Sequence, residues 1–452
     1  MKNISLKELI LKRVGKHLEY IAVVGSFKTL LYSDLISVPD KLFGQNVILY
    51  IADPVAYIKA LVSLDGSVKK LCPISTLSDE EDLMHLLALG EFDTVVSDLD
   101  ESDLEIFRQK NLRYCNVIEL DTHDKERLNN IKYNTTWLIP TSGTTSRPKL
   151  VRHKLASLAS SALKSKNYSS ENRVWGQFYD FTRFAGYQIL FNSLLNGHTV
   201  VMSSFYDKIS ERIQHCSENL VTHISATPTQ WRKILMSGVA TKIPLKQIIL
   251  GGEAADQPIL NALRKSFPMA RITHTYASTE AGLGISVSDG LAGFPVRFLE
   301  SSKGSVDLKI RKEKLFLSSS SSALGYNDDT KLKDQQGWID TGDLVKVEEE
   351  RFYIIGRTNG IINVGGDKVN PEHIRHILLK HPNIEQVRIY GKKSPITGMV
   401  LAADIQLKTN VNEKVEKNSI KTFVKDKFQP KDQPRIINIV GEILINSTGK
   451  LN

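Results

Sequence analysis

Short apolar runs alternate with amphipathic segments over the first 130 residues of the chain. The runs at 22–24, 47–51 and 94–97 are rich in valine and isoleucine and have the length of strands, whereas 55–63 has the spacing of a helix. Strands that alternate with helices favour parallel pairing within one sheet. The N-terminal part of the chain is therefore predicted to be α/β.

The same alternation continues through the middle of the chain. A helix is predicted over 153–166, and another ends near 196–197. Strands are predicted at 199–201, 222–226 and 247–250. The last of these opens onto Gly251-Gly252-Glu253. Because open α/β sheets bind ligands at the carboxyl ends of their strands, we expect 251–253 to lie at a binding site.

The pattern changes after Gly356-Arg357-Thr358-Asn359-Gly360, a polar segment bracketed by glycines. Beyond it come the apolar segment 361–364, predicted strands at 386–391, 400–407 and around 436–440, and predicted helices at 371–381 and near 415–427. A chain of 452 residues is also too long for one compact core. We predict a large N-terminal domain of layered sheets and helices (1–356), a hinge (357–360) and a small mobile α+β domain (361–452). The serine run 318–322 is interpreted as a loop.

Composition is ordinary for a globular protein, with 41% apolar and 24% charged residues. No apolar stretch of the sequence approaches the ~20 residues that span a bilayer. The first residues also lack the apolar core of a signal peptide. A cytoplasmic protein without a membrane span is expected. Cys72, Cys115 and Cys216 lack metal-site or disulfide spacing, and we expect them to be reduced.

The formal net charge is +9, and residues 361–452 carry 12 Lys and 3 Arg against 4 Asp and 5 Glu, a net of +6. These charges are scattered, and no basic motif interleaved with aromatic residues accompanies them, so a nucleic-acid partner is not predicted. Two interpretations stay open: a solvated face, or a surface that receives an anionic partner.

Hydroxyl side chains and a glycine crowd the segment from Thr141 to Lys149, directly after the apolar run 137–139. Unhindered backbone N–H groups and O–H donors suit a polyphosphate, although a polar turn between strands is the simpler alternative. No Gly-Lys-Ser/Thr follows, so this is not a P-loop. The segment resembles the phosphate-binding signature of the adenylate-forming superfamily, which includes acyl- and aryl-CoA synthetases, luciferases and peptide-synthetase adenylation domains. The residues that the resemblance assigns to the nucleotide here are Thr141, Ser142, Gly143, Thr144, Thr145 and Lys149.

A second segment, Tyr276-Ala277-Ser278-Thr279-Glu280, resembles the Tyr-Gly-x-Thr-Glu motif of that superfamily. The resemblance implies that the Tyr276 ring lies against adenine, that Thr279 contacts the α-phosphate and that Glu280 holds Mg²⁺. A hard carboxylate oxygen beside substrate phosphates is what Mg²⁺ prefers. Ala277 is assigned to the acid pocket, and Gly251, Gly252 and Glu253 to the nucleotide site.

Two further motifs follow in the family's order. Gly337-Trp338-Ile339-Asp340-Thr341-Gly342-Asp343 resembles Gly-Trp-x-x-Thr-Gly-Asp, which implies that Asp343 accepts from the ribose hydroxyls. Arg357 with 361–372 resembles the hinge and first turn of the mobile C-terminal domain. Arg357 would hold ribose or phosphate oxygens, Asn359 would be the pivot, and Gly365 and Gly366 would let backbone approach a pantetheine arm.

The end of the chain, 447–452, resembles the last motif of the superfamily, whose lysine contacts both the carboxylate and the α-phosphate. The corresponding residue is Lys450. The five matches extend from Thr141 to the last residue. The resemblance implies that a carboxylic acid is activated with ATP as an acyl-adenylate, after which the C-terminal domain rotates and a thiol attacks.

The chain departs from the family pattern at several positions. Ser146 and Leu150 stand where glycine is usual. Arg183-Phe184-Ala185-Gly186 stands where many members have His-x-x-Gly, so Arg183 and Gly186 are assigned to the acid pocket. We expect Arg183 to pair with a second anionic or polar group of the substrate, the alternative being a surface arginine.

We predict an ATP-dependent ligase that joins a small-molecule carboxylic acid to a thiol, with ATP, Mg²⁺ and CoA as cofactors. The alternatives are an enzyme that loads the phosphopantetheine of an acidic acyl carrier protein, a weakened nucleotide-binding homologue, and a basic nucleic-acid binder. The residues leave the identity of the acid open.

Overall fold

The structure is a computed structural model. The residues that it describes are 4–36, 44–120, 133–141, 147–164, 173–300, 306–364, 367–394, 398–409, 411–444 and 450–451. Among these residues Cys72, Cys115 and Cys216 are free and buried, as expected. No described helix is long and apolar enough to cross a membrane.

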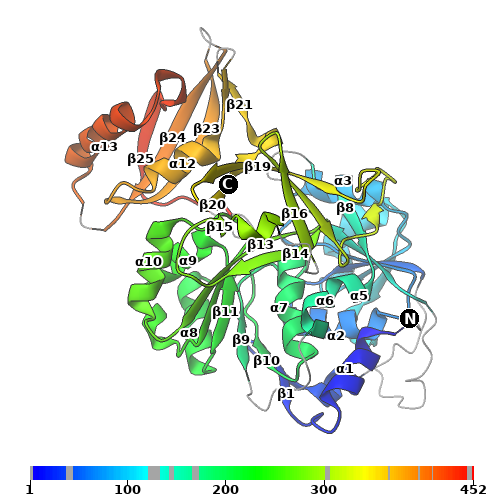
Figure 1. Cartoon of the computed structure of the whole chain (residues 1–452). Coiled ribbons are helices and arrows are strands. Elements are labelled where there is room, and N and C mark those ends of the chain that lie inside the picture. The colour runs from blue at the N-terminus through cyan, green and yellow to red at the C-terminus, as the bar shows by residue number, and fades with distance from the viewer. Residues whose placement is uncertain are drawn as a thin grey trace.

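Two mostly parallel sheets form the centre of the N-terminal part (Figure 1). Sheet A has the order β14-β13-β12-β11-β9-β10-β1-β2. Its strands are β1 (Ile21–Val24), β2 (Thr29–Leu31), β9 (Val174–Gln177), β10 (Thr199–Val201), β11 (His223–Ala226), β12 (Gln247–Leu250), β13 (Arg271–Ser278) and β14 (Gly282–Val287). The edge strands β2 and β14 pair antiparallel, whereas the six between them pair parallel.

Sheet B has the order β18-β8-β7-β4-β3-β5-β6. Its strands are β3 (Asn46–Tyr50), β4 (Lys70–Pro73), β5 (Thr94–Ser97), β6 (Arg113–Asn116), β7 (Thr136–Pro140), β8 (Leu150–His153) and β18 (Gly325–Tyr326). The helices of the two sheets are α1 (Leu6–Val14), α2 (Pro54–Leu64), α3 (Glu80–Leu89), α4 (Glu105–Gln109), α5 (Leu155–Leu158), α6 (Ser160–Lys164), α7 (Phe184–Leu194), α8 (Ile209–Glu218), α9 (Pro228–Met236) and α10 (Gln257–Ser266). Asp53 caps α2 and Thr227 caps α9, each with proline in the first turn.

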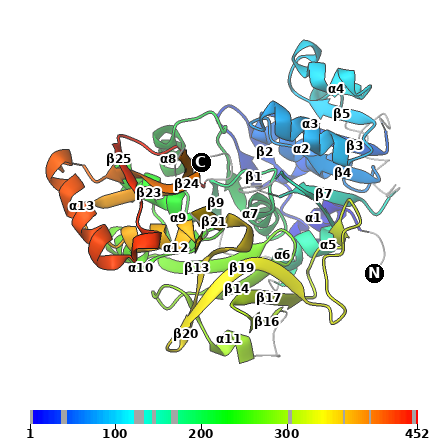
Figure 2. The same ribbon diagram turned by 90° about the horizontal axis from the view of Figure 1, so that it is seen from above.

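Sheet C is antiparallel, in the order β15-β20-β19-β17-β16, and lies on the opposite side of the molecule from α3 and α4 (Figure 2). Its elements are β15 (Phe294–Pro295), α11 (Arg297–Glu300), β16 (Val306–Arg311), β17 (Lys314–Ser319), β19 (Ile339–Glu348) and β20 (Arg351–Arg357). The predicted hinge takes in the last residue of β20 and the short helix η6 (Thr358–Gly360).

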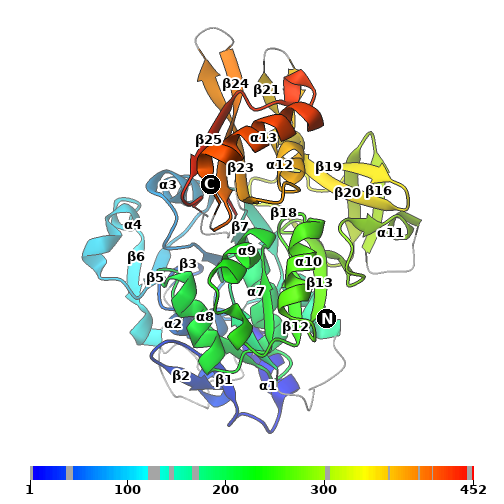
Figure 3. The ribbon, with the colours of Figure 1, turned by 90° about the vertical axis from the view of Figure 1, so that its left-hand side faces the viewer.

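The C-terminal part is a small α+β unit at one end of the molecule (Figure 3). It contains β21 (Ile362–Val364), β22 (Asp367–Val369), α12 (Pro371–Leu378), β23 (Ile384–Ser394), β24 (Gly398–Leu407), α13 (Glu413–Lys427) and β25 (Ile436–Val440). It has a hydrophobic core of its own, with Ile374, Leu378, Val387 and Ile420 at its centre. The predicted fold class is confirmed: a large α/β N-terminal part and a small α+β C-terminal part.

Two local predictions were wrong. The helix predicted over 153–166 is two short helices, α5 and α6, preceded by β8, which pairs antiparallel with β7. The serine run 318–322 is only partly a loop, since Ser318 and Ser319 complete β17 opposite β16. Pairing with β7 takes His153 into β8, and pairing with β16 takes Ser318 and Ser319 into β17, because pairing and burial override local sequence preference.

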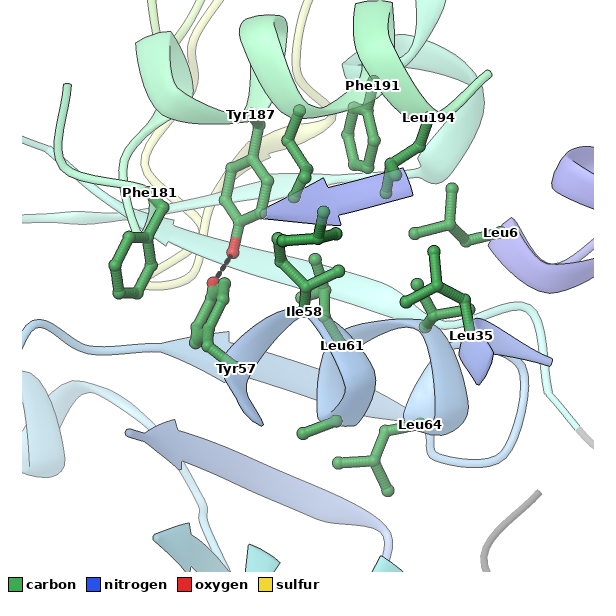
Figure 4. Packing of buried hydrophobic residues seen from close by; sticks show 14 of the residues in the cluster. Leu6, Leu35, Tyr57, Ile58, Leu61, Leu64, Phe181, Tyr187, Phe191 and Leu194 are labelled. Atoms are coloured by element: carbon green, nitrogen blue, oxygen red, sulfur yellow. Dashed lines mark hydrogen bonds between the residues drawn. The ribbon is translucent and has the colours of Figure 1, made fainter. Parts of the chain in front are cut away.

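The largest core cluster packs α2 against α7, and Figure 4 shows its side chains. Tyr57 on α2 and Tyr187 on α7 are fully buried, and their hydroxyl groups form a hydrogen bond to each other. The Tyr57 ring also packs on Phe181, with the ring centroids 4.6 Å apart. This cluster therefore supports the segment that leads into α7.

The tyrosine pair gives a test of this packing. Tyr57→Phe removes one hydroxyl and leaves the other buried without this partner, which should lower the free energy of unfolding by about 1–3 kcal/mol. In the double variant with Tyr187→Phe, the free energy of unfolding should fall by less than the sum of the two single changes, because neither buried hydroxyl is left without a partner. Thermal melting of the three variants checks this. Strictly additive effects would show that the pair is not coupled.

Candidate active site

A cavity of about 340 Å³, the main cavity, opens at the carboxyl ends of the parallel strands of sheet A. Thr141 reaches it after β7, Gly251 and Gly252 after β12, and Thr279 and Glu280 after β13. Ala277, Arg183, Arg357 and Lys450 complete the set of predicted site residues that line it. Segments far apart in the sequence thus meet at the edge of the sheet where ligands are expected.

A second cavity of about 550 Å³, the interdomain cavity, lies between the N-terminal and C-terminal parts. Glu253 and Asp343 line it together with Glu372, Arg375 and Leu451 from the C-terminal part. The two cavities share Gly252, Arg357 and Lys450. Lys450 therefore stands where the two spaces meet.

Asp343 joins two of the motifs. The Tyr276 hydroxyl donates to Asp343 Oδ2 at 2.5 Å, and Arg357 Nε donates to Asp343 Oδ1 at 3.0 Å. Each carboxylate oxygen can accept more than one hydrogen bond, so both keep capacity for a further donor. Burial and the negative charge of Asp343 raise the pKa of the Tyr276 hydroxyl, so it stays protonated as the donor.

Glu280 is the predicted metal ligand. Its Oε1 accepts from the Tyr326 hydroxyl at 3.3 Å, and the carboxylate lines the main cavity. Among the described residues no group of three or more His, Cys, Asp or Glu side chains could hold a metal ion. One carboxylate beside space for phosphate oxygens fits Mg²⁺, which usually binds proteins through one or two carboxylates.

Thr279 is held by His153, a residue that the sequence analysis missed. His153 Nε2 lies 2.8 Å from the Thr279 carbonyl oxygen, which can only accept, so this nitrogen carries the proton. Nδ1 then accepts from Ser157 Oγ at 2.9 Å. The ring also stacks on Phe184, which lines the main cavity, with the centroids 5.9 Å apart. A histidine in a short strand gave no sequence signal for this role.

The glycines after β12 are required by close packing. A Cβ on Gly251 would lie 2.8 Å from Thr275 Oγ1, and the Tyr179 hydroxyl donates to the Gly251 carbonyl at 3.1 Å. Gly252 has φ +80°, a conformation that side chains rarely adopt. Backbone atoms of Gly251 and Gly252, without side chains, therefore form part of the wall of the main cavity. Glu253 follows and accepts from the Thr229 backbone N–H at 3.0 Å.

Lys450 reaches the cavities from the last residues of the chain. Burial lowers its pKa, and the carboxylate of Glu253 acts in the opposite direction. A cationic side chain in a partly enclosed space stabilises anions more strongly than one in open water.

The acid-pocket residues are placed differently from one another. Arg183 lines the main cavity, and its Nη1 donates to the Thr141 carbonyl at 3.2 Å, so it is not the surface arginine of the alternative. Gly186 is buried and is absent from the described lining. A Cβ there would lie 2.2 Å from the Asp180 carbonyl oxygen, so this glycine allows α7 to pack against the preceding turn.

Several predicted residues lie elsewhere or are not described. Ser142, Gly143, Thr144, Thr145, Ser146, Gly365 and Gly366 lie outside the described residues. Lys149 is exposed, with Nζ 4.8 Å from the Tyr326 ring centroid. Leu150 is buried in β8 and packs with Cys72 and Leu138. Asn359 is exposed in η6.

Polar contacts between described residues join the N-terminal and C-terminal parts. Arg375 Nη2 donates to Thr229 Oγ1 at 3.2 Å, and Gln386 Nε2 donates to the Thr229 carbonyl at 3.4 Å. Lys233 Nζ pairs with Glu442 at 2.9 Å. Thr229 lies in the first turn of α9, beside Glu253. The contacts hold the C-terminal part in the position that places Lys450 at the cavities.

The large α/β part, the small C-terminal unit and the lysine that stands between them match the architecture of adenylate-forming enzymes. The chain belongs to the AMP-binding enzyme family. The family model matches residues 47–313, and the model of the AMP-binding enzyme C-terminal domain matches residues 374–450. The protein is an AMP-forming acid–thiol ligase, which uses ATP and acts on a small-molecule carboxylic acid.

Similar proteins include CoA ligases. A 2-succinylbenzoate–CoA ligase of Bacillus velezensis is 26% identical over 373 residues, covering 78% of this chain and 73% of the relative. A corresponding ligase of Bacillus cereus is 25% identical over 436 residues, covering 90% of this chain and 87% of the relative.

Solved structures share the fold. The anthranilate CoA ligase AuaEII in complex with anthranoyl-AMP has a TM-score of 0.81 at 16% identity, covering 99% of this chain and 96% of that one. An E. coli MenE variant with bound OSB-AMS has a TM-score of 0.78 at 20% identity, covering 96% and 94%.

The environment of His153 predicts a pH effect on stability. Burial lowers its pKa to about 4, below the ~6.5 of an unfolded histidine. As the pH falls below ~6.5, the unfolded state takes up a proton that the folded ring does not accept, so stability is lost by up to ~3 kcal/mol near pH 4.

His153→Gln keeps a donor for the Thr279 carbonyl without a titrating ring. Its melting temperature should therefore fall less than that of the wild type between pH 7 and pH 5, measured by circular dichroism. Ser157→Ala, which keeps the ring, is the control and should retain the steep profile. Parallel profiles for wild type and His153→Gln would contradict this assignment.

Proposed function

We propose that Lys450, Arg357, Thr279 and Glu280 carry out the adenylation step in the main cavity. The observation that supports this most directly is that Lys450 lines both cavities, next to Gly252 and Arg357. In this step a carboxylate oxygen of the acid attacks the α-phosphorus of ATP, and pyrophosphate leaves. No protein nucleophile is needed, because alignment and charge stabilisation supply the rate.

We assign the positive charge in this step to Lys450 and Arg357, and the contact to the α-phosphate to the Thr279 hydroxyl. Asp343 would accept hydrogen bonds from the ribose hydroxyls, because each of its oxygens can accept one more donor besides Tyr276 or Arg357. Gly251, Gly252, Thr141 and the loop 142–145, with Lys149, would receive the phosphates and the nucleotide. Glu280 would hold Mg²⁺, which supplies positive charge between phosphate oxygens when bound.

For the second step we propose that the C-terminal part, 361–452, turns about 357–360 with Asn359 as the pivot. The Arg375 and Gln386 contacts to Thr229 would open, Lys450 would leave, and Gly365 and Gly366 would approach the thiol. Because the hydrogen bonds to Thr229 and the Lys233–Glu442 ion pair join polar groups, these groups can be solvated by water once they separate.

For the acid we propose a molecule with a second oxygen-bearing group that meets Arg183. Arg183 lines the same cavity as Thr279 and Lys450, so an acid that reaches both would extend from the α-phosphate toward α7. The relatives named above act on 2-succinylbenzoate, which carries such groups. A cytoplasmic location stays a prediction.

The adenylation roles are tested with Lys450→Ala. Acid-dependent ATP–pyrophosphate exchange should fall on the order of 10²–10³-fold, because a pre-positioned charge is lost. Thiolysis of supplied acyl-adenylate should be largely retained, since Lys450 leaves the site before that step. Lys421→Ala, on the exposed face of α13, is the matched control. Equal losses in both half-reactions would argue against the assignment.

CoA is the proposed acceptor, and an acidic carrier protein is the alternative that the basic C-terminal part keeps open. Thioester formation should be faster with CoA than with any of a panel of phosphopantetheinylated carrier proteins at equal concentration. Mass spectrometry of the products measures both. A carrier protein that is loaded faster than CoA would reverse the choice.

A further inference from the structure

The acid end of the main cavity contains a pair of opposite charges. The charged side chains among its described lining residues are Asp180, Arg183, Glu280, Arg357 and Lys450. Glu280, Arg357 and Lys450 belong to the adenylation end. The charge that a substituent of the acid meets near α7 is therefore set by Asp180 and Arg183.

Asp180 and Arg183 form an ion pair inside the protein. Asp180 Oδ2 lies 3.7 Å from Arg183 Nε, and the side chains are 0% and 15% exposed. Asp180 Oδ1 accepts from the Thr182 backbone N–H at 2.8 Å and from Thr182 Oγ1 at 2.6 Å. The carboxylate is thus fixed, and only Oδ2 is directed to the guanidinium.

Arg183 cannot turn to a substrate carboxylate without a cost. If it left Asp180, a fully buried carboxylate would lose its cation, and a buried charge without a partner is strongly destabilising. The backbone is fixed as well, since the Arg183 N–H donates to the Asp180 carbonyl at 3.1 Å and Gly186 packs on that carbonyl. The pair therefore acts as a unit with no net charge.

The wall formed by α7 offers acceptors rather than cations. Gln188 Nε2 donates to the Leu158 carbonyl at 3.0 Å, and Asn192 Nδ2 donates to the Gln188 carbonyl at 2.7 Å. Both residues line the cavity, and these bonds leave their side-chain oxygens as acceptors. The wall therefore presents uncharged amide groups, which can hydrogen-bond to a hydroxyl, keto or amide substituent but carry no cation that would balance a second carboxylate.

We propose, on the basis of the ligase function above, that Asp180 excludes a second carboxylate and that the substrate carries one negative charge. The group that meets Arg183 and the α7 wall is then an uncharged hydrogen-bonding group, such as a hydroxyl, keto or amide group. This sets the chain apart from relatives whose named substrate, 2-succinylbenzoate, has two carboxylates. Asp180 is a specificity-determining residue in this proposal.

The test compares matched acids. Acid-dependent ATP–pyrophosphate exchange is measured with each ring isomer of hydroxybenzoate and of carbamoylbenzoate, and with the benzene dicarboxylate of the same ring positions. Aliphatic hydroxy acids are compared with their dicarboxylic counterparts in the same way, and 2-succinylbenzoate is included. In the matched pair that gives the fastest exchange, kcat/KM for the acid with the uncharged substituent should exceed kcat/KM for the dicarboxylate at least about tenfold. This ratio corresponds to ~1.4 kcal/mol.

A charge series then tests the residue. Asp180→Asn leaves the arginine uncompensated and should lower this preference by about tenfold or reverse it, whereas Arg183→Gln should increase it. The double variant restores a pair without net charge and should return to the wild-type preference. Thr182→Val disturbs the same carboxylate without changing its charge and is the control. If Asp180→Asn does not fold, Arg183→Gln and the double variant still show whether the substrate preference follows the charge of the pair.

The outcomes separate the two levels of the proposal. No exchange above the acid-free blank with any acid would overturn the ligase function itself. Exchange that favours dicarboxylates in the wild type, or a preference that does not follow the charge series, would overturn only the role of Asp180.

Discussion

The site depends on the carboxylate of Asp343, which holds together three parts of the chain. It accepts from Tyr276 at the end of β13 and from Arg357 at the end of β20, and it lies itself in β19. Sheet A, sheet C and the entrance to the C-terminal part are therefore connected at one buried group. Because Arg357 is the residue before η6, the direction in which the chain leaves for the C-terminal part is fixed at the same point.

The contrast between this anchor and the interdomain contacts supports the proposal that the C-terminal part turns while the nucleotide site stays in place. Asp343 is 5% exposed, and its partners are Arg357 on the adjacent strand β20 of sheet C and Tyr276 on β13 of sheet A. The described contacts between the two parts run instead through Arg375, Gln386 and Lys233, which hydrogen-bond or pair with polar groups. Polar contacts can be exchanged for water at small net cost, whereas a buried carboxylate cannot easily give up its donors.

The spacing of apolar residues predicted helices and strands well where the buried positions repeat with the period of a helix or a strand. β12 and β25 have the predicted bounds, and α13 begins two residues earlier than predicted. Of the residues assigned from the motifs, Thr141, Gly251, Gly252, Thr279, Glu280, Arg357 and Lys450 line the main cavity, whereas their roles stay predictions. Pairing between distant segments was not predictable: β1 precedes β3 in sequence but joins sheet A beside β10. His153 was missed for the same reason, since its partner Thr279 lies 126 residues away in the sequence. Asp180 was missed although Arg183 lies only three residues further on, because their burial together at the cavity depends on the fold.

The charges along the main cavity divide it into two chemical ends. At the adenylation end Lys450 and Arg357 stand near Glu280 and Asp343, so cations and carboxylates are both present and a phosphate group with Mg²⁺ can be accommodated. At the α7 end Asp180 and Arg183 balance each other, and the neighbouring groups are amides and hydroxyls. An acid that enters with its carboxylate toward α7 would meet a neutral pair and the amide oxygens, whereas the opposite orientation brings it to Lys450. In the proposed binding mode, the electrostatic difference between the two ends therefore favours the orientation that brings the carboxylate of the acid to Lys450.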